Sequence, residues 1–159
     1  SVTPIADGYG IPAYIHAADR ELLAHPERAI SAQAVDFLRQ INAEFAEPAG
    51  VEVLDAETEL NLAGLSFTAL PAPGHTPGST AFRVADGRPR MFSGDLLFKG
   101  SIGRTDLPGG DHDQMMTSLR QVVLPAAPST IVHCGHGPDT TVGEELAANP
   151  YLRGLVGAA

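Results

Sequence analysis

Two histidines and one aspartate occupy similar places in the second half of the sequence. His75 lies in PGHTPGS, Asp95 in FSGD and His136 in CGHGP, and each follows a run of residues typical of a β-strand. Loops at strand ends commonly gather functional side chains, and glycine beside a ligand allows the backbone to approach closely. Neutral imidazole binds Zn²⁺, and a carboxylate has two oxygens that can bridge two cations. The spacing therefore predicts a metal centre formed by these three side chains.

Each of these residues also has a simpler explanation. A histidine beside glycine and proline is commonly a turn residue, and an isolated aspartate such as Asp95 is typical of a turn or a helix cap. His133 lies within a predicted strand, where the alternation of side chains favours a structural role. Cys134 is interpreted as a small buried apolar residue. The remaining histidines are expected to have surface, packing or capping roles: His16, His25 and His112.

The glycine-rich loop 103–111 has two interpretations. Arg104 and Asp106 flank one residue, so their side chains either pair and pin the loop, or Arg104 contacts a substrate. Lys99 and Arg104 place positive charge near Asp95 in an otherwise acidic chain. This charge predicts that Lys99 and Arg104 bind an anionic substrate.

The surrounding pattern predicts alternating helices and strands that position these loops. A strand is expected over 11–16, a short helix over 17–24, and a helix over 32–45 that is capped by Ser31 and covers a sheet. Residues 51–95 are read as consecutive sheet strands. Further along, we expect a helix from Asp111 to about Leu124, a strand over 130–134, and a last helix that opens at Thr141 and closes at Asn149-Pro150.

Composition limits the classes of function. The 159 residues, 43% hydrophobic and 18% charged, are typical of one globular domain, so 1–159 is read as a single domain or part of one. A net charge of −9 argues against binding to nucleic acid. The apolar stretches are too short to cross a membrane, and a single cysteine favours a cytoplasmic location.

Three segments carry a family resemblance: PAPGHTPGS, FSGDLLFKGSIGRTDLPGGD and CGHGPDTTVGEELAANPYL. They resemble, in order and spacing, the second half of glyoxalase II-like hydrolases with the metallo-β-lactamase fold. The resemblance implies an α/β (α+β) αββα sandwich, here mainly its second half, and a site with two divalent metals, zinc or alternatively iron or manganese. It further implies that His75 completes the ligand set of one metal, His136 that of the other, and that Asp95 bridges both as the catalytic carboxylate.

The sequence departs from the family pattern in one respect. The His-x-His-x-Asp-His motif, which supplies the other ligands, is expected just before Ser1 and occurs nowhere in the chain. The resemblance therefore implies a metal-dependent thioester hydrolase in the complete protein, with weak metal binding and no catalysis by this chain alone. A carboxylate at position 95 argues against the β-lactamases that use cysteine there.

Two alternatives remain open on sequence grounds. Iron persulfide dioxygenases share this fold and use a 2-His-1-carboxylate site, to which His75 and Asp95 would contribute. A non-catalytic unit is the other alternative, in which the apolar inner face of the sheet mediates a homodimer.

Overall fold

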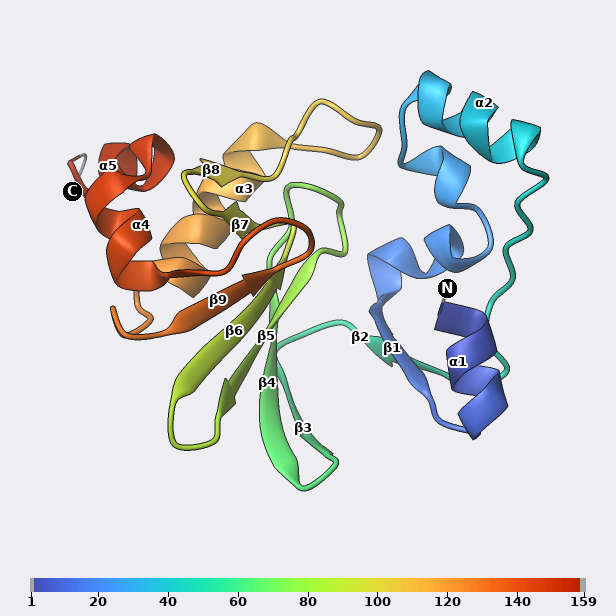
Figure 1. Cartoon of the computed structure of the whole chain (residues 1–159), viewed down its shortest axis with the longest axis horizontal. Helices are drawn as coiled ribbons and strands as arrows, with labels where there is room; N and C mark the ends of the chain where they lie inside the picture. Colours follow the sequence, from blue (N-terminus) through green and yellow to red (C-terminus); the bar gives the residue numbers. More distant parts are fainter. Residues whose placement is uncertain (1, 158–159) are drawn as a thin grey trace.

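The centre of the molecule is a six-stranded sheet with strand order β10-β9-β6-β5-β4-β3 (Figure 1). The computed structural model describes residues 2–157. The strands are β3 (Thr58–Leu62), β4 (Leu65–Pro71), β5 (Thr80–Ala85), β6 (Pro89–Gly94), β9 (Ile131–Cys134) and β10 (Thr140–Thr141). Short turns join β3 to β4 and β5 to β6, as the sequence predicted, whereas the longer loop 72–79 joins β4 to β5; all three pairs are antiparallel.

The direction of the strands brings three chain segments to one edge of the sheet. β4 and β6 are each antiparallel to β5 and thus run the same way, and β9 pairs parallel with β6. The carboxyl ends of β4, β6 and β9 therefore meet at one edge. These are the strand ends that precede His75, Asp95 and His136.

Helices from the last third of the chain cover one face of this sheet (Figure 1). They are α3 (His112–Ser118), which continues into the π-helical segment η3 (Leu119–Val123), followed by α4 (Val142–Ala148) and α5 (Pro150–Val156). Met91 of β6 is fully buried in the same apolar core as Met115, Leu119 and Leu152. A short hairpin, β7 (Leu97–Phe98) and β8 (Ser101–Ile102), joins this core through Leu97 and Ile102.

Residues 2–54 form a separate group of elements beside the sheet, at the right of Figure 1. It contains α1 (Val2–Tyr9), β1 (Ala13–His16), the 3₁₀ helices η1 (Ala17–Leu23) and η2 (Pro26–Arg28), α2 (Ala32–Gln40) and β2 (Val51–Leu54). β1 and β2 pair parallel, with Ala13 opposite Val51. The helices between them provide the crossover connection that a parallel pair requires.

Three predictions for this part of the chain were wrong. The strand at 51–54 does not continue the main sheet, because its partner is β1 rather than β3. The helix that begins after Ser31 ends at Gln40 instead of residue 45, since Asn42 adopts a left-handed conformation (φ 49°) that terminates it. This helix also buries no residue, and Phe37 and Ile41 on its apolar stripe are exposed, so it does not cover a sheet.

Helix predictions based on capping residues were confirmed. Ser31, Asp111 and Thr141 each accept a backbone N–H three residues ahead, and Thr141 and Glu144 form a reciprocal capping box. Helices α1 and α5 were not predicted. Asn149 was read as a helix end, but its side chain also accepts the N–H of Tyr151 and caps α5. None of the helices in the described part of the chain is long and apolar enough to span a membrane.

Candidate metal centre

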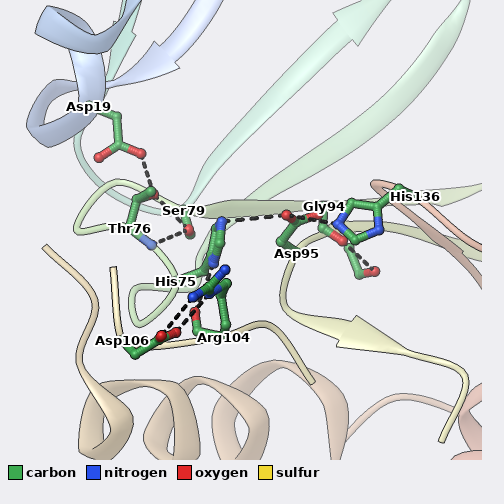
Figure 2. A network of polar contacts seen from close by, with 10 residues as sticks. Asp19, His75, Thr76, Ser79, Gly94, Asp95, Arg104, Asp106 and His136 are labelled. Carbon is green, nitrogen blue, oxygen red and sulfur yellow. Dashed lines mark hydrogen bonds and ion pairs between the residues drawn. The ribbon is translucent and has the colours of Figure 1, made fainter. Parts of the chain in front are cut away.

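His75, Asp95 and His136 come together at the shared edge of the sheet, as predicted (Figure 2). His75 lies in the β4–β5 loop, Asp95 follows β6, and His136 follows β9. The Nε2 atoms of both histidines lie 3.4 Å from the same oxygen, Oδ2 of Asp95. One carboxylate oxygen thus stands between two imidazoles.

These distances are too long for strong hydrogen bonds. A charge-assisted N–H···O contact measures about 2.7–2.9 Å, whereas both separations here are 3.4 Å. Two ligands bound at about 2.0–2.1 Å to one tetrahedral zinc lie about 3.4 Å apart. The spacing therefore fits a metal ion between Asp95 and each histidine better than direct hydrogen bonding.

A backbone carbonyl fixes the orientation of His75. Its Nδ1 lies 2.8 Å from the carbonyl oxygen of Arg104, which can only accept a hydrogen bond. Nδ1 therefore donates, and the Nε2 lone pair of the neutral ring is left free toward Asp95. A partner of this kind on the second ring nitrogen is usual for histidines that bind metals. No sequence pattern indicated this contact, because it depends on how loop 103–110 folds back.

Different contacts hold His136. Its side chain is 77% exposed, and its ring packs against Phe98 of β7 with centroids 4.6 Å apart. The thiol of Cys134 donates to the carbonyl oxygen of His136 at 3.3 Å. Cys134 is half-buried rather than buried, so its predicted role as a buried apolar residue was wrong, and it instead braces the turn that carries His136.

Two glycines allow the backbone to close around Asp95. A Cβ atom at Gly135 would lie 2.3 Å from Oδ1 of Asp95, and one at Gly103 would lie 1.8 Å from its carbonyl oxygen. No other residue fits either position without moving Asp95. Gly135 precedes His136 directly, so the close approach sets the spacing between the carboxylate and this histidine.

Arg104 and Asp106 form an ion pair, which is the first of the two interpretations given for their loop. Arg104 donates through Nε and Nη2 to the two carboxylate oxygens of Asp106, at 2.7 and 2.6 Å. The hydrogen bonds from Arg104 lower the pKa of Asp106 to about 2. Lys99 is exposed in the turn between β7 and β8. Substrate binding by Lys99 and Arg104 stays a prediction.

Three of the other histidines have structural contacts. His133 lies 2.9 Å from Asp139 and stacks on Phe92 of the neighbouring strand. His16 accepts the N–H of Ala18 at the start of η1, and His25 contacts Glu27. His112 is exposed on the first turn of α3.

The donor set fits metal ions that are shared through Asp95. Imidazole nitrogen and carboxylate oxygen are ligands of zinc and of other divalent transition metals. Within residues 2–157, no three His, Cys, Asp or Glu side chains are grouped closely enough to hold one ion. The described residues thus offer two side-chain ligands to each ion, one histidine and the shared aspartate.

The sequence profile of the metallo-β-lactamase superfamily matches residues 1–136. This chain belongs to that superfamily. The predicted mixed α+β metallo-β-lactamase fold is therefore confirmed. The BLEG-1 B3 metallo-β-lactamase superposes with a TM-score of 0.79 at 35% identity, over 95% of this chain and 69% of that protein. TTHA1623, solved in a di-iron-bound form, gives 0.71 at 38% identity, over 94% and 69%.

Relatives within the metallo-β-lactamase superfamily span most of the chain. An uncharacterised protein of Mycobacterium tuberculosis is 38% identical over 98% of this chain and 70% of its own length. A probable metallo-hydrolase of Bacillus subtilis, YqgX, is 37% identical over 95% and 68%. The chain thus has the fold of metal-dependent hydrolases.

Two further similarities cover less of each protein. Hydroxyacylglutathione hydrolase GloC of Haemophilus influenzae is 44% identical over 93 residues, which are 58% of this chain and 43% of GloC. ETHE1 of Myxococcus xanthus superposes with a TM-score of 0.61 at 31% identity, over 67% of this chain and 48% of that protein.

Proposed function

We propose that this chain forms the second half of a two-metal site in a hydrolase that acts on thioesters. The observation that carries the proposal is the position of Oδ2 of Asp95, 3.4 Å from Nε2 of both His75 and His136. A single oxygen between two imidazoles is the arrangement expected of a carboxylate that bridges two ions. Zinc is the proposed metal, with iron or manganese as alternatives.

The residues of the chain have separate tasks in this proposal. His75 binds one ion through Nε2, because its Nδ1–H is donated to the carbonyl oxygen of Arg104. His136 would hold the other ion, and Asp95 would be a ligand of both. Metal ions bound there would supply a Lewis acid and a water molecule of lowered pKa.

The acyl substrate is proposed from similarity and charge. GloC, a hydroxyacylglutathione hydrolase, is 44% identical over the matched residues, and such substrates are anionic thioesters. Lys99 is exposed and comes directly after Phe98 in the sequence. The ring of Phe98 packs against that of His136, so Lys99 lies close to the proposed site in the chain. We propose that Lys99 binds a carboxylate of the substrate, and that Arg104 contacts the substrate through guanidinium N–H groups that Asp106 does not accept.

The 159-residue chain by itself is predicted to bind metal weakly and to lack catalysis. Structural and catalytic zinc sites use three or four protein ligands, whereas the described residues provide two to each ion. We therefore propose the activity for the complete protein and not for this chain alone.

The test is thiol release from a glutathione thioester by the protein as the cell makes it, after loading with Zn²⁺, Fe²⁺ or Mn²⁺. We expect metal-dependent release that Asp95→Ala lowers by more than about 100-fold, since even outer partners of metal ligands contribute about 10–100-fold. Glu59→Gln, an exposed change on β3, is the matched control and should retain the parental rate.

Two other outcomes would replace the proposal. Hydrolysis of a β-lactam without thioester hydrolysis would favour the activity suggested by the name of BLEG-1, which is 35% identical. Oxygen consumption with a persulfide, supported by one iron per chain, would favour the dioxygenase alternative. Thiol release that is unchanged in Asp95→Ala would contradict the assigned role of Asp95.

A further inference from the structure

A buried carboxylate from the N-terminal part of the chain holds the loop that carries His75 (Figure 2). Asp19 of η1 is 9% exposed, and its Oδ1 accepts the N–H of Gly78 at 2.7 Å. Its Oδ2 accepts the hydroxyl of Thr76, the residue next to His75. Both contacts join segments that are nearly sixty residues apart in the sequence.

The loop fits closely against this carboxylate. A Cβ atom at Gly78 would lie 2.6 Å from Cγ of Asp19 and 2.9 Å from its backbone nitrogen. Only glycine therefore allows this approach. Thr76 is further fixed by Ser79, whose Oγ accepts the N–H of Thr76 at 3.0 Å. The polypeptide directly after His75 is thus ordered by contacts that begin at Asp19.

The polypeptide before His75 is held from the opposite side. The N–H of Asp111 donates to the carbonyl oxygen of Gly74 at 2.8 Å, and the hydroxyl of Ser118 donates to that of Pro73 at 2.7 Å. Gly74 itself packs against the backbone of Met115 in α3. His75 is therefore placed between α3 on one side and Asp19 on the other.

We infer that Asp19 is a positioning residue for His75, acting through Thr76 and Gly78. The inference deepens the proposed function, since it concerns how one proposed metal ligand is aimed. Asp19 does not belong to the apolar core beneath the sheet, and its two hydrogen bonds both end on the His75 loop. Loss of this carboxylate should disturb His75 while leaving His136, on the turn after β9, in place.

The experiment compares Asp19→Ala and Asp19→Asn with the parent chain. Thr141→Ala is the matched control, since it removes a helix cap from α4 and destabilises the protein without touching the His75 loop. The first measurement is the tautomer of His75, read from its imidazole nitrogen NMR signals without metal. The second is broadening of the His75 and His136 signals by Co²⁺ alone.

We expect the parent to hold His75 as the Nδ1–H tautomer, and Asp19→Ala to give mixed tautomers. Co²⁺ affinity at His75 should fall by about tenfold or more in Asp19→Ala, with Asp19→Asn between the two and His136 unchanged. An unchanged His75 in Asp19→Ala would overturn the inference, as would an equal effect of Thr141→Ala. If Asp19→Ala does not fold, the tautomer in Asp19→Asn decides by the same criterion.

Failure of the proposed function has a different signature. If Co²⁺ does not broaden His75 in the parent, the assignment of His75 as a metal ligand falls. The tautomer measurement, which uses no metal, still decides the role of Asp19.

Discussion

The carboxylate of Asp95 is confined by its neighbours, and this confinement is what places Oδ2 between the two histidines. Gly135 contributes most directly, because its missing Cβ leaves the space that Oδ1 of Asp95 occupies. The sequence places glycine on both sides of His136, and this pattern indicated a close approach. The pattern did not indicate which atom comes close to Gly135, since Asp95 and Gly135 follow two different strands, β6 and β9.

Gly135→Ala tests this close approach. The added Cβ would lie 2.3 Å from Oδ1 of Asp95, so the carboxylate must move. We expect Co²⁺ to broaden both His75 and His136 less at equal concentration in an NMR titration. Gly154→Ala, on the exposed side of α5 with open space around it, is the control. It should raise stability by about 0.5–1 kcal/mol and leave the metal response unchanged.

The Arg104–Asp106 pair gives a pH prediction at the residue scale. The pKa of Asp106 lies at about 2, below the ordinary value of 3.8, because Arg104 donates to its carboxylate. The stabilising effect of this pair is therefore fully present above pH 3.8 and is lost as the pH falls through about 2. Carboxyl carbon NMR should show Asp106 titrating near its ordinary pKa in Arg104→Gln. An unchanged low pKa in that variant would contradict the assigned cause.

The site could be predicted from sequence only in part. His75, Asp95 and His136 each follow a strand and stand beside glycine, so their motifs indicated a shared site. Arg104, Phe98 and Asp19 support the histidines through a carbonyl oxygen, a ring face and a buried carboxylate. These contacts arise from tertiary folding and have no local pattern.

At the scale of elements, three helix starts were predicted correctly from their capping residues, whereas strand pairing over long distances was not. Ser31, Asp111 and Thr141 start helices because each caps its own backbone a few residues ahead. The pairing of β2 with β1 depends on a crossover of more than thirty residues, for which period-two alternation carries no information. The same alternation therefore placed 51–54 in the wrong sheet.

The exposed stripe of α2 provides a test of that helix. Phe37 is 58% exposed, whereas Met91 of β6 is fully buried in the core. We expect Phe37→Ala to change the free energy of unfolding by less than about 0.5 kcal/mol. Met91→Ala should lower it by about 2–5 kcal/mol. Denaturant unfolding measures both, and a large loss in Phe37→Ala would show that α2 is covered by another surface.

At the scale of the whole molecule, the face of the sheet opposite α3–α5 carries aromatic side chains. Phe92 is 44% exposed, and Phe67 lies beside it with ring centroids 6.5 Å apart. Self-association through this face, expected from the sequence, stays a prediction. Sedimentation should give a mass above 16.6 kDa that falls in Phe92→Thr. A monomer at all concentrations would contradict it.

The central claim is that His75 and His136 bind metal ions through the oxygen of Asp95 that lies between them. The most direct measurement is a Zn²⁺ titration of the chain, followed through the imidazole NMR signals of all six histidines. Zn²⁺ should shift His75 and His136 selectively, and Asp95→Ala should reduce both shifts together. Equal shifts at His16, His25, His112 and His133, or shifts that persist in Asp95→Ala, would contradict the account.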